Sequence, residues 1–203
     1  MRIPKHIGII PDGNRRYAKG LNMSKEKGYA RGLAPGLSAF KYCRDMGVEE
    51  LSIYGFTVDN TKRPAVQRQA FTKACVDMVD IISKENCQIL VAGNTKSPMF
   101  PLELEKYTSR QVCGKGGIKV NFLINYSWQW DLKAEKSFYN TADISRIDLI
   151  IRWGGMRRLS GFLPVQSVYA DFYVVDNMWP EYKDSDIYEA LLWYGKQDVT
   201  LGG

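Results

Sequence analysis

Six runs of apolar and β-branched residues recur along the chain and predict six β-strands. Each run is nearly continuous and does not alternate strictly with polar residues. This pattern is typical of strands that are covered on both faces in a parallel sheet. The runs are His6–Ile10, Leu51–Phe56, Gln88–Ala92, Ile118–Ile124, Ile147–Ile151 and Phe172–Val175.

Segments with apolar residues at helical spacing lie between these runs. They predict helices over Pro35–Met46, Ala65–Glu85, Pro101–Val112 and Asp184–Tyr194. Strands that alternate with helices are the pattern of α/β proteins. We therefore expect residues 1–203 to form a single α/β domain, with one six-stranded, mostly parallel sheet surrounded by helices.

The composition is that of an ordinary globular domain, with 45% hydrophobic and 25% charged residues. The longest apolar runs are far shorter than the roughly 20 residues that cross a bilayer. The first residues show no signal-peptide core, and the four cysteines lack close C-x-x-C spacing. We expect a cytoplasmic protein with reduced thiols.

The net charge narrows the class of partner and of chemistry. A charge of +6 favours anionic partners without distinguishing nucleic acid, acidic lipid and diphosphates. His6 is the only histidine, so a His-rich metal cluster is excluded and a Ser-His-Asp triad would depend on this one residue. Acids, arginines, hydroxyls or a hard cation must carry any reaction.

The segment DGNRR, at 12–16, follows the first apolar run. Ligands of open α/β sheets bind beyond the carboxyl ends of the strands. Gly13 would let backbone N–H groups approach an anion, Arg16 would supply a guanidinium fork, and Asp12 would bind a hard cation such as Mg²⁺. The alternative is a turn that caps a helix, with both arginines in solvent.

A second basic segment, IRWGGMRRLS at 151–160, also follows an apolar run. Arg152, Arg158 and Ser160 would surround a second diphosphate, and the two glycines would admit it closely. The alternative is a basic turn on the surface. Two segments rich in Arg and Gly at strand ends favour the interpretation as an anion site.

Two further segments contain candidate ligands. FTVDNTKRP, at 56–64, ends a strand ahead of Pro64, which suits a helix start. Asn60 or Thr61 would cap that helix, or this segment would contact a ligand directly. Asp171, at the start of the last predicted strand, is either a second cation ligand or an ordinary solvated acid.

These segments resemble, in order and over nearly the whole chain, motifs of the cis-prenyltransferase family, whose best-known members make undecaprenyl diphosphate. HIGIIPDGNRRYAKG is similar to the family's opening strand and phosphate loop, and LSIYGFTVDNTKRP to its F-S-x-E-N-W-x-R-P motif. INYSWQWDL resembles N-Y-G-G-R, LIIRWGGMRRLSGFLPVQSVYADFY resembles R-T-G-G-E-x-R-x-S-x-F with the following Y-A-E, and WPEY resembles W-P-D-F. The resemblance implies an undecaprenyl diphosphate synthase-like sheet, a homodimer and an apolar tunnel beside the diphosphate sites.

The resemblance also implies roles for single residues. Asp12 would bind Mg²⁺, Asn60 would help to remove a proton, and Asp171 stands where the family has a metal-binding glutamate. Contacts with the allylic diphosphate are implied for Gly13, Asn14, Arg16 and Arg63, and contacts with the homoallylic diphosphate for Arg152, Arg158 and Ser160. Three more substrate-binding candidates occupy family positions with a changed side chain: Arg15 for a glycine, Lys25 for an arginine and Tyr29 for a histidine.

The implied reaction is the Mg²⁺-dependent condensation of an allylic prenyl diphosphate with a C5 diphosphate to a short-chain product. The RR pair after D-G-N, G-Y for G-H, and S-x-F-x-P before Y-A-D resemble lavandulyl-type synthases, which couple head-to-middle with dimethylallyl diphosphate. The final GKQDVTLGG lacks the arginines of the family's R-x-R-R-F-G-G tail. Irregular coupling is slightly favoured, and regular head-to-tail elongation with isopentenyl diphosphate is the alternative.

Two other classes of function remain as alternatives. A noncatalytic accessory subunit would tend to keep the carboxyl-terminal motif and lose the phosphate loop, the reverse of this sequence. An RNA-binding module is favoured by charge alone. We expect prenyl diphosphates as partners, peripheral membrane contact through a lipid product, and no nucleic acid.

Overall fold

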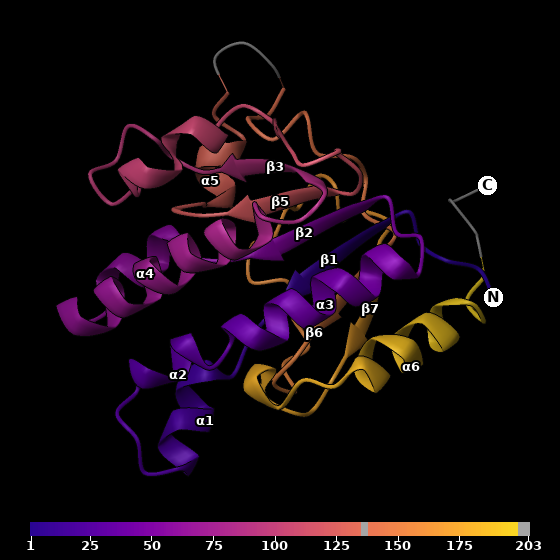
Figure 1. Ribbon diagram of the computed structural model, residues 1–203, viewed down its shortest axis with the longest axis horizontal. Coiled ribbons are helices and arrows are strands. Elements are labelled where there is room, and N and C mark those ends of the chain that lie inside the picture. The colour runs from indigo at the N-terminus through magenta and orange to yellow at the C-terminus, as the bar shows by residue number, and fades with distance from the viewer. Residues whose placement is uncertain (135–137, 199–203) are drawn as a thin grey trace.

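A seven-stranded sheet forms the centre of the computed structural model, which describes residues 1–134 and 138–198 (Figure 1). The strands are ordered β4-β3-β5-β2-β1-β6-β7. All neighbours run parallel except β3 and β4, which pair antiparallel. The bounds are β1 His6–Ile10, β2 Glu50–Tyr54, β3 Cys87–Ala92, β4 Gln111–Cys113, β5 Lys119–Leu123, β6 Leu149–Arg152 and β7 Asp171–Val174.

Helices connect the strands and cover the sheet. The α-helices are α1 Asn14–Gly20, α2 Lys27–Ala30, α3 Leu33–Asp45, α4 Ala65–Ile82, α5 Trp128–Asp131 and α6 Asp184–Tyr194. Over residues 1–134 and 138–198, three 3-10 helices span Val58–Lys62, Leu102–Tyr107 and Trp179–Glu181. In the described part of the chain, no helix combines the length and apolar character needed to cross a membrane.

The two faces of the sheet have different covers. Helices α4, α3 and α6 lie side by side across one face, where they pack on alternate strand residues such as Ile7 and Ile9 (Figure 1). The strand residues that alternate with Ile7 and Ile9 point to the other face of the sheet. There Ile10 and Ile150 pack with Phe162 and Leu163 in a second apolar cluster. A Cβ at Gly8 would lie 2.6 Å from the Phe162 ring, so this position needs glycine. Because both faces are covered, the strands read as continuous apolar runs.

All six predicted strands are present, and the predicted six-stranded sheet gains a seventh strand. The predicted helix over Pro101–Val112 is wrong, because this segment forms the 3-10 helix Leu102–Tyr107 and then β4. Leu104 and Tyr107 are buried three residues apart, a spacing that suits either kind of helix. Strand β4 has only three residues and pairs with Cys87–Ile89, so a distant segment determines its conformation.

Buried polar residues lie at the amino ends of the central strands. Asn121 Nδ2 donates hydrogen bonds to Glu50 Oε1 at 2.7 Å and to Ser52 Oγ at 3.0 Å. His6 Nε2 lies 2.8 Å from the same Ser52 oxygen, and Ser145 Oγ donates to Glu50 Oε2 at 2.7 Å. These contacts tie β1, β2 and β5 together at the edge of the sheet opposite the pocket described next.

Candidate active site

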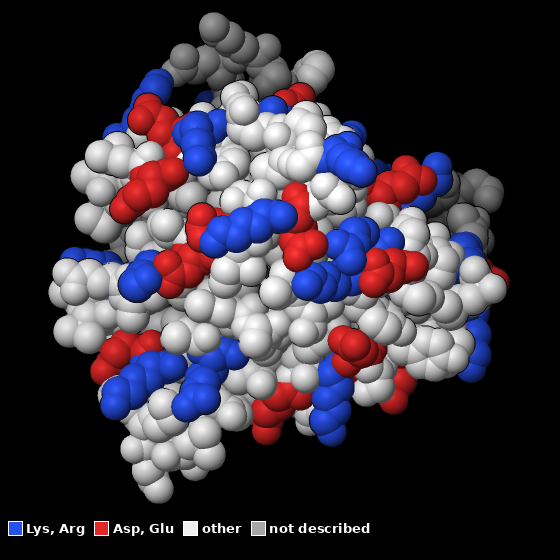
Figure 2. Space-filling view, in the orientation of Figure 1, with Lys and Arg blue, Asp and Glu red and all other residues white. Residues whose placement is uncertain are grey.

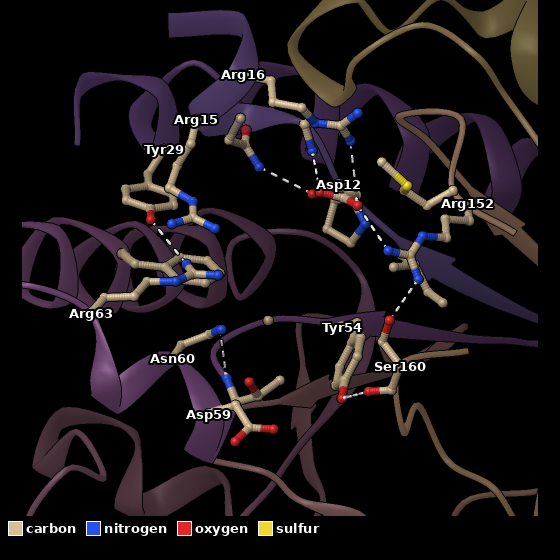
Figure 3. A pocket seen from close by; sticks show the side chains of 18 of the residues that line it. Asp12, Arg15, Arg16, Tyr29, Tyr54, Asp59, Asn60, Arg63, Arg152 and Ser160 are labelled. Carbon is tan, nitrogen blue, oxygen red and sulfur yellow. Dashed lines mark hydrogen bonds and ion pairs between the residues drawn. The ribbon is translucent and has the colours of Figure 1, made fainter. Parts of the chain in front are cut away.

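A pocket of about 430 Å³ lies at the carboxyl ends of β1, β2 and β6 (Figure 3). Five arginines and two aspartates are the charged residues that line it: Arg15, Arg16, Arg63, Arg152, Arg158, Asp12 and Asp59. The segments that supply them are far apart in the sequence and meet because parallel strands end at one edge of the sheet. The excess of positive charge suits a ligand with several negative charges.

The loop after β1 is fixed by its backbone. Gly13 has φ 107°, and a Cβ there would lie 2.6 Å from the Met178 sulfur, so glycine is needed both for conformation and for space. The backbone N–H of Gly13 donates to Asp12 Oδ1 at 2.6 Å, and Trp179 N donates to the Asp12 carbonyl at 2.9 Å. Helix α1 then begins at Asn14. The result is a rigid turn with Asp12 on the pocket wall.

Arginines surround the Asp12 carboxylate. Arg152 Nη2 donates to Asp12 Oδ2 at 2.8 Å, and Arg16 Nη2 lies 3.5 Å from the same oxygen. A Cβ at Gly154 would collide with the Arg16 guanidinium, so the glycine after β6 makes room for this arrangement. The pairing holds the two basic segments together across the pocket.

The loop at 158–160 is attached to the same cluster. Arg152 Nη1 donates to Ser160 Oγ at 2.9 Å and to the Arg158 carbonyl. Tyr54 OH donates to the Ser160 carbonyl at 2.8 Å, and Ser160 itself has φ 53°. The Arg158 side chain is exposed and lines the pocket. This loop therefore offers a hydroxyl and an exposed guanidinium to the pocket.

The third wall is built by Arg63 and aromatic rings. Arg63 Nη1 donates to Tyr29 OH at 2.9 Å, and Tyr29 stacks on Phe71 with ring centroids 4.5 Å apart. The Arg63 guanidinium also lies 5.3 Å from the Phe71 ring centre. Burial lowers the pKa of Arg63, although a guanidinium still keeps its proton. A partly desolvated cation of this kind is a strong attractor for an anion.

Asn60 takes part in a cap and also lines the pocket. Its Oδ1 accepts the backbone N–H of Thr57 at 3.0 Å, which closes a capping box on the 3-10 helix Val58–Lys62. The prediction that Asn60 caps the helix after Pro64 is wrong, because the N-cap of α4 is Pro64 and has no side-chain hydrogen bond; Asn60 belongs instead to the capping box of the preceding 3-10 helix. The same residue borders the cavity beside Arg63.

The structure brings most of the predicted site residues together. Those that line the pocket are Asp12, Gly13, Asn14, Arg15, Arg16, Tyr29, Asn60, Arg63, Arg152, Arg158 and Ser160. Lys25 does not line it and is exposed in the turn before α2. Tyr54 and Phe71 also line it and were not predicted, although Tyr54 ends a predicted strand.

The position of Asp171 rules out a metal site that it shares with Asp12 in the same chain. Asp171 begins β7 and is in register with Leu149, the first residue of β6, which pairs with Ile7 in β1. Asp12 follows the last residue of β1. The two acids therefore lie at opposite edges of the sheet and cannot bind one cation within a single chain.

Without Asp171, the pocket still suits a Mg²⁺ ion that is held by one protein carboxylate together with substrate phosphates. Among residues 1–134 and 138–198, no three His, Cys, Asp or Glu side chains converge on a point. Protein-bound Mg²⁺, however, is commonly held by one or two carboxylates together with substrate phosphates. Asp12, on the wall of a pocket that suits phosphates, fits the role of that single carboxylate.

An apolar cavity of about 70 Å³ adjoins the polar pocket. The two share Asn14, Tyr29, Tyr54 and Phe71 among their lining residues. Beyond these, α3 and α4 form its walls, with Leu33, Gly36, Cys75 and Met78. The Met78 sulfur occupies space 2.9 Å from where a Cβ on Gly36 would be, so Met78 fills the gap between the helices. A molecule with a charged head and a short apolar tail would fit the combined space.

Comparisons with known proteins agree over almost the whole chain. The model of a family described as putative undecaprenyl diphosphate synthase matches residues 10–138 and 133–202. An isoprenyl transferase of Leptospira interrogans is 27% identical over 99% of this chain and 95% of that protein. A ditrans,polycis-undecaprenyl-diphosphate synthase ((2E,6E)-farnesyl-diphosphate specific) of Haemophilus influenzae is 28% identical over 99% of this chain and 96% of that protein.

A solved structure has the same fold. It is the crystal structure of lavandulyl diphosphate synthase from Lavandula x intermedia in complex with dimethylallyl diphosphate. The TM-score is 0.82 over 99% of both chains, at 20% sequence identity. This likeness confirms the α/β architecture with its mostly parallel sheet.

Proposed function

This chain belongs to the prenyltransferase family whose model is described as putative undecaprenyl diphosphate synthase, and from that premise we propose that it joins an allylic prenyl diphosphate to a second, five-carbon prenyl diphosphate. The product is a short-chain prenyl diphosphate, and the reaction needs Mg²⁺. One observation carries the proposal: a single pocket collects Asp12 and five arginines beside an apolar cavity. The pocket suits the charged heads and the cavity suits the tail of one allylic molecule.

The residues around the pocket would stabilise the separation of charge. The allylic C1–O bond breaks, diphosphate leaves with the electron pair, and a new carbon–carbon bond forms before one proton is lost. Arg16 and Arg63 would hold the departing diphosphate, where preorganised positive charge is worth several kcal/mol. Mg²⁺, when bound through Asp12, supplies further charge neutralisation at the phosphate oxygens.

The second diphosphate would bind on the opposite wall. Arg158 is exposed to the pocket, and Ser160 presents its hydroxyl there. Asn60 lies on the third wall and is proposed to help remove the proton, although its Oδ1 is also engaged by Thr57. Tyr29 and Phe71, between pocket and cavity, would keep water from the cation, which water would otherwise quench.

We propose that the coupling is the irregular, head-to-middle one with dimethylallyl diphosphate as acceptor. It is supported by Arg15 and Tyr29, which differ from the usual family residues and both line the pocket. The small apolar cavity also favours a short tail. Regular head-to-tail elongation with isopentenyl diphosphate is the second candidate, supported by relatives such as the Haemophilus influenzae enzyme.

Incubation of the purified protein with Mg²⁺ and dimethylallyl diphosphate, with and without isopentenyl diphosphate, tests the proposal. Mass spectrometry and NMR of the product alcohols identify the carbon skeleton. Coupling without isopentenyl diphosphate supports the irregular reaction, and strict dependence on it supports the regular one. Absence of any condensation with dimethylallyl, geranyl or farnesyl diphosphate would contradict the proposed function.

The assembled pocket disfavours the other two classes. An accessory subunit has no need of Asp12 and Ser160 both bound to Arg152. Nucleic-acid binding usually involves a basic patch or stripe. The described residues on the face in Figure 2 show acidic and basic side chains interspersed.

We also propose that the protein forms a homodimer, lies in the cytoplasm and contacts membranes peripherally through a lipid product. The final residues compared with the family's arginine tail, from 199 onward, lie outside the described residues. Sedimentation of the purified protein at several concentrations would test the dimer.

A further inference from the structure

Arg152 lies between the two loops that line the polar pocket. One of its terminal nitrogens donates to Asp12 at 2.8 Å, and the other donates to the Ser160 hydroxyl at 2.9 Å and to the Arg158 carbonyl. Figure 3 shows the guanidinium placed between Asp12 and Ser160. Both Nη atoms therefore already have protein partners.

This arrangement makes ligands compete with protein groups. The N–H of Arg152 that donates to Asp12 can donate to a diphosphate only if Asp12 is exchanged for that diphosphate. A cation at Asp12 Oδ2 would weaken the ion pairs of that oxygen with Arg152 and Arg16, whose nitrogens lie 2.8 Å and 3.5 Å from it. The two events involve the same ion pair, so they are linked.

Burial distinguishes Arg152 from the other arginines of the pocket. Only 5% of its side chain is exposed, compared with 39% for Arg16. Its Nε is buried without a hydrogen-bond partner among the described residues. Water cannot readily replace a lost carboxylate at such a site, and an uncompensated buried charge is strongly unfavourable. Arg152 must therefore find another anion whenever Asp12 turns away.

Resting on the proposed function, we propose that Arg152 couples the two diphosphate subsites by exchanging Asp12 for the second diphosphate. Once Asp12 turns to the cation that accompanies the first diphosphate, the Nη2 group of Arg152 donates to the second one. The contacts with Ser160 and the Arg158 carbonyl hold the guanidinium in place during the exchange. By linkage, each ligand then strengthens binding of the other by the same factor.

Calorimetry with unreactive ligands tests the coupling. Dimethylallyl S-thiolodiphosphate would fill the first subsite with Mg²⁺, and isopentenyl diphosphate, which is not allylic, would probe the second. In the wild type we expect the first ligand to raise the affinity for isopentenyl diphosphate about tenfold, within the usual range of coupling between sites. In Arg152→Lys the ratio of affinities should fall to near one, because one ammonium cannot maintain the two-sided contact. Arg157→Lys, at an exposed neighbour that does not line the pocket, should keep the wild-type ratio.

Asp12→Asn supplies a second signature if Arg152→Lys fails to fold. The amide keeps the shape and an oxygen for the Gly13 N–H, but it releases Arg152. Affinity for isopentenyl diphosphate alone should therefore rise, whereas a merely structural Asp12 would leave it unchanged or lower it. A wild-type ratio near one with both ligands bound, a wild-type ratio in Arg152→Lys, or no gain in Asp12→Asn would overturn the coupling. Failure of both diphosphates to bind the wild type would refute the proposed function itself.

Discussion

At the amino ends of the central strands, His6, Glu50 and Ser52 are buried against one another, whereas at the carboxyl ends Asp12 and Arg152 border an open pocket. Both clusters mix charge with hydrogen bonds, and both join strands that are distant in sequence. The two clusters differ in how many of their charged and polar groups lack a protein partner. At the amino ends, each polar group named here is matched by another side chain or by the backbone.

The carboxyl ends have more positive charge than the protein itself can pair. Among the described residues, five arginines and two aspartates line the pocket, and one of these aspartates, Asp59, pairs with Lys62 at 2.8 Å. Buried polar groups that satisfy one another stabilise a fold, and unmatched charge beside a cavity indicates a ligand. The comparison therefore assigns stability to the amino ends and binding to the carboxyl ends.

Asp12→Ala gives the largest expected effect at the carboxyl ends. Turnover should fall about 100- to 1,000-fold, because removal of a group that stabilises developing charge commonly costs this much. The free energy of unfolding should also fall, by about 3–5 kcal/mol, because the buried Arg152 guanidinium loses its carboxylate partner, so turnover is compared per folded molecule. Steady-state kinetics and urea unfolding of the same preparation measure both quantities.

Asp59→Ala is the matched control for that variant. Asp59 lines the same pocket, but its side chain is 83% exposed and pairs with a solvated lysine. Its turnover should stay within about tenfold of the wild type, the range of a modest surface interaction. Near-normal rates in Asp12→Ala would refute the role of that carboxylate.

Glu50→Ala is the corresponding change at the amino ends. It removes the acceptor of Asn121 Nδ2 and of Ser145 Oγ in a buried environment. We expect a loss of about 2–4 kcal/mol in the free energy of unfolding, because buried partners are left unsatisfied. The turnover number per folded molecule should be unchanged, which urea unfolding and active-site titration would show.

Glu49→Ala tests whether the loss of stability in Glu50→Ala comes from burial of the acid or from its charge alone. Glu49 is the adjacent acid, exposed and only 3.8 Å from Lys5. Its removal should change the free energy of unfolding by less than about 0.5 kcal/mol. Equal effects of the two substitutions would break the comparison between the ends of the sheet.

Some residues of the pocket could be predicted from the sequence and others could not, for physical reasons. The strand runs place DGNRR and IRWGGMRRLS beyond strand ends, so topology alone brings Asp12 and Arg152 together. Asp171 lies away from Asp12 within one chain because it begins a strand and Asp12 follows one, as the sequence already indicated; its metal role stays a prediction from the resemblance alone. Phe71 was missed because its place on the wall depends on how α2 and α4 pack. Tyr54 was missed because its side chain is held by Ser160 and Phe162, which are distant in sequence.

The apolar cavity beside the pocket predicts which length of substrate tail the protein prefers. In Met78→Ala, loss of the side chain that fills the gap beside Gly36 should lengthen the space between α3 and α4. The preference for geranyl over dimethylallyl diphosphate, as the ratio of kcat/KM, should rise about tenfold, since each buried methylene is worth about 0.8 kcal/mol. Val76→Ala, on the same helix and outside the cavity lining, is the control. An unchanged ratio in Met78→Ala would mean that the tail lies elsewhere.

His6 gives the smallest expected effect and separates the two ends by pH. Burial lowers its pKa, although Glu50 and Asp148 act in the opposite direction. The unfolded chain takes up a proton below about pH 6.5, and the folded chain resists it until a lower pH. Stability is therefore complete above that value and declines as pH falls toward the folded pKa, by up to about 1.4 kcal/mol per pH unit.

Urea unfolding at about pH 7.5 and about pH 5.5 measures this decline, above the range in which most carboxylates titrate. His6→Gln keeps a side chain that can hydrogen-bond Ser52 but does not titrate, so its stability should vary less between the two values. Affinity for inorganic diphosphate in the pocket should not follow the same protonation, because His6 lies at the opposite edge of the sheet. An identical pH dependence in His6→Gln and wild type would place the titrating group elsewhere and remove the amino-end cluster from the pH response.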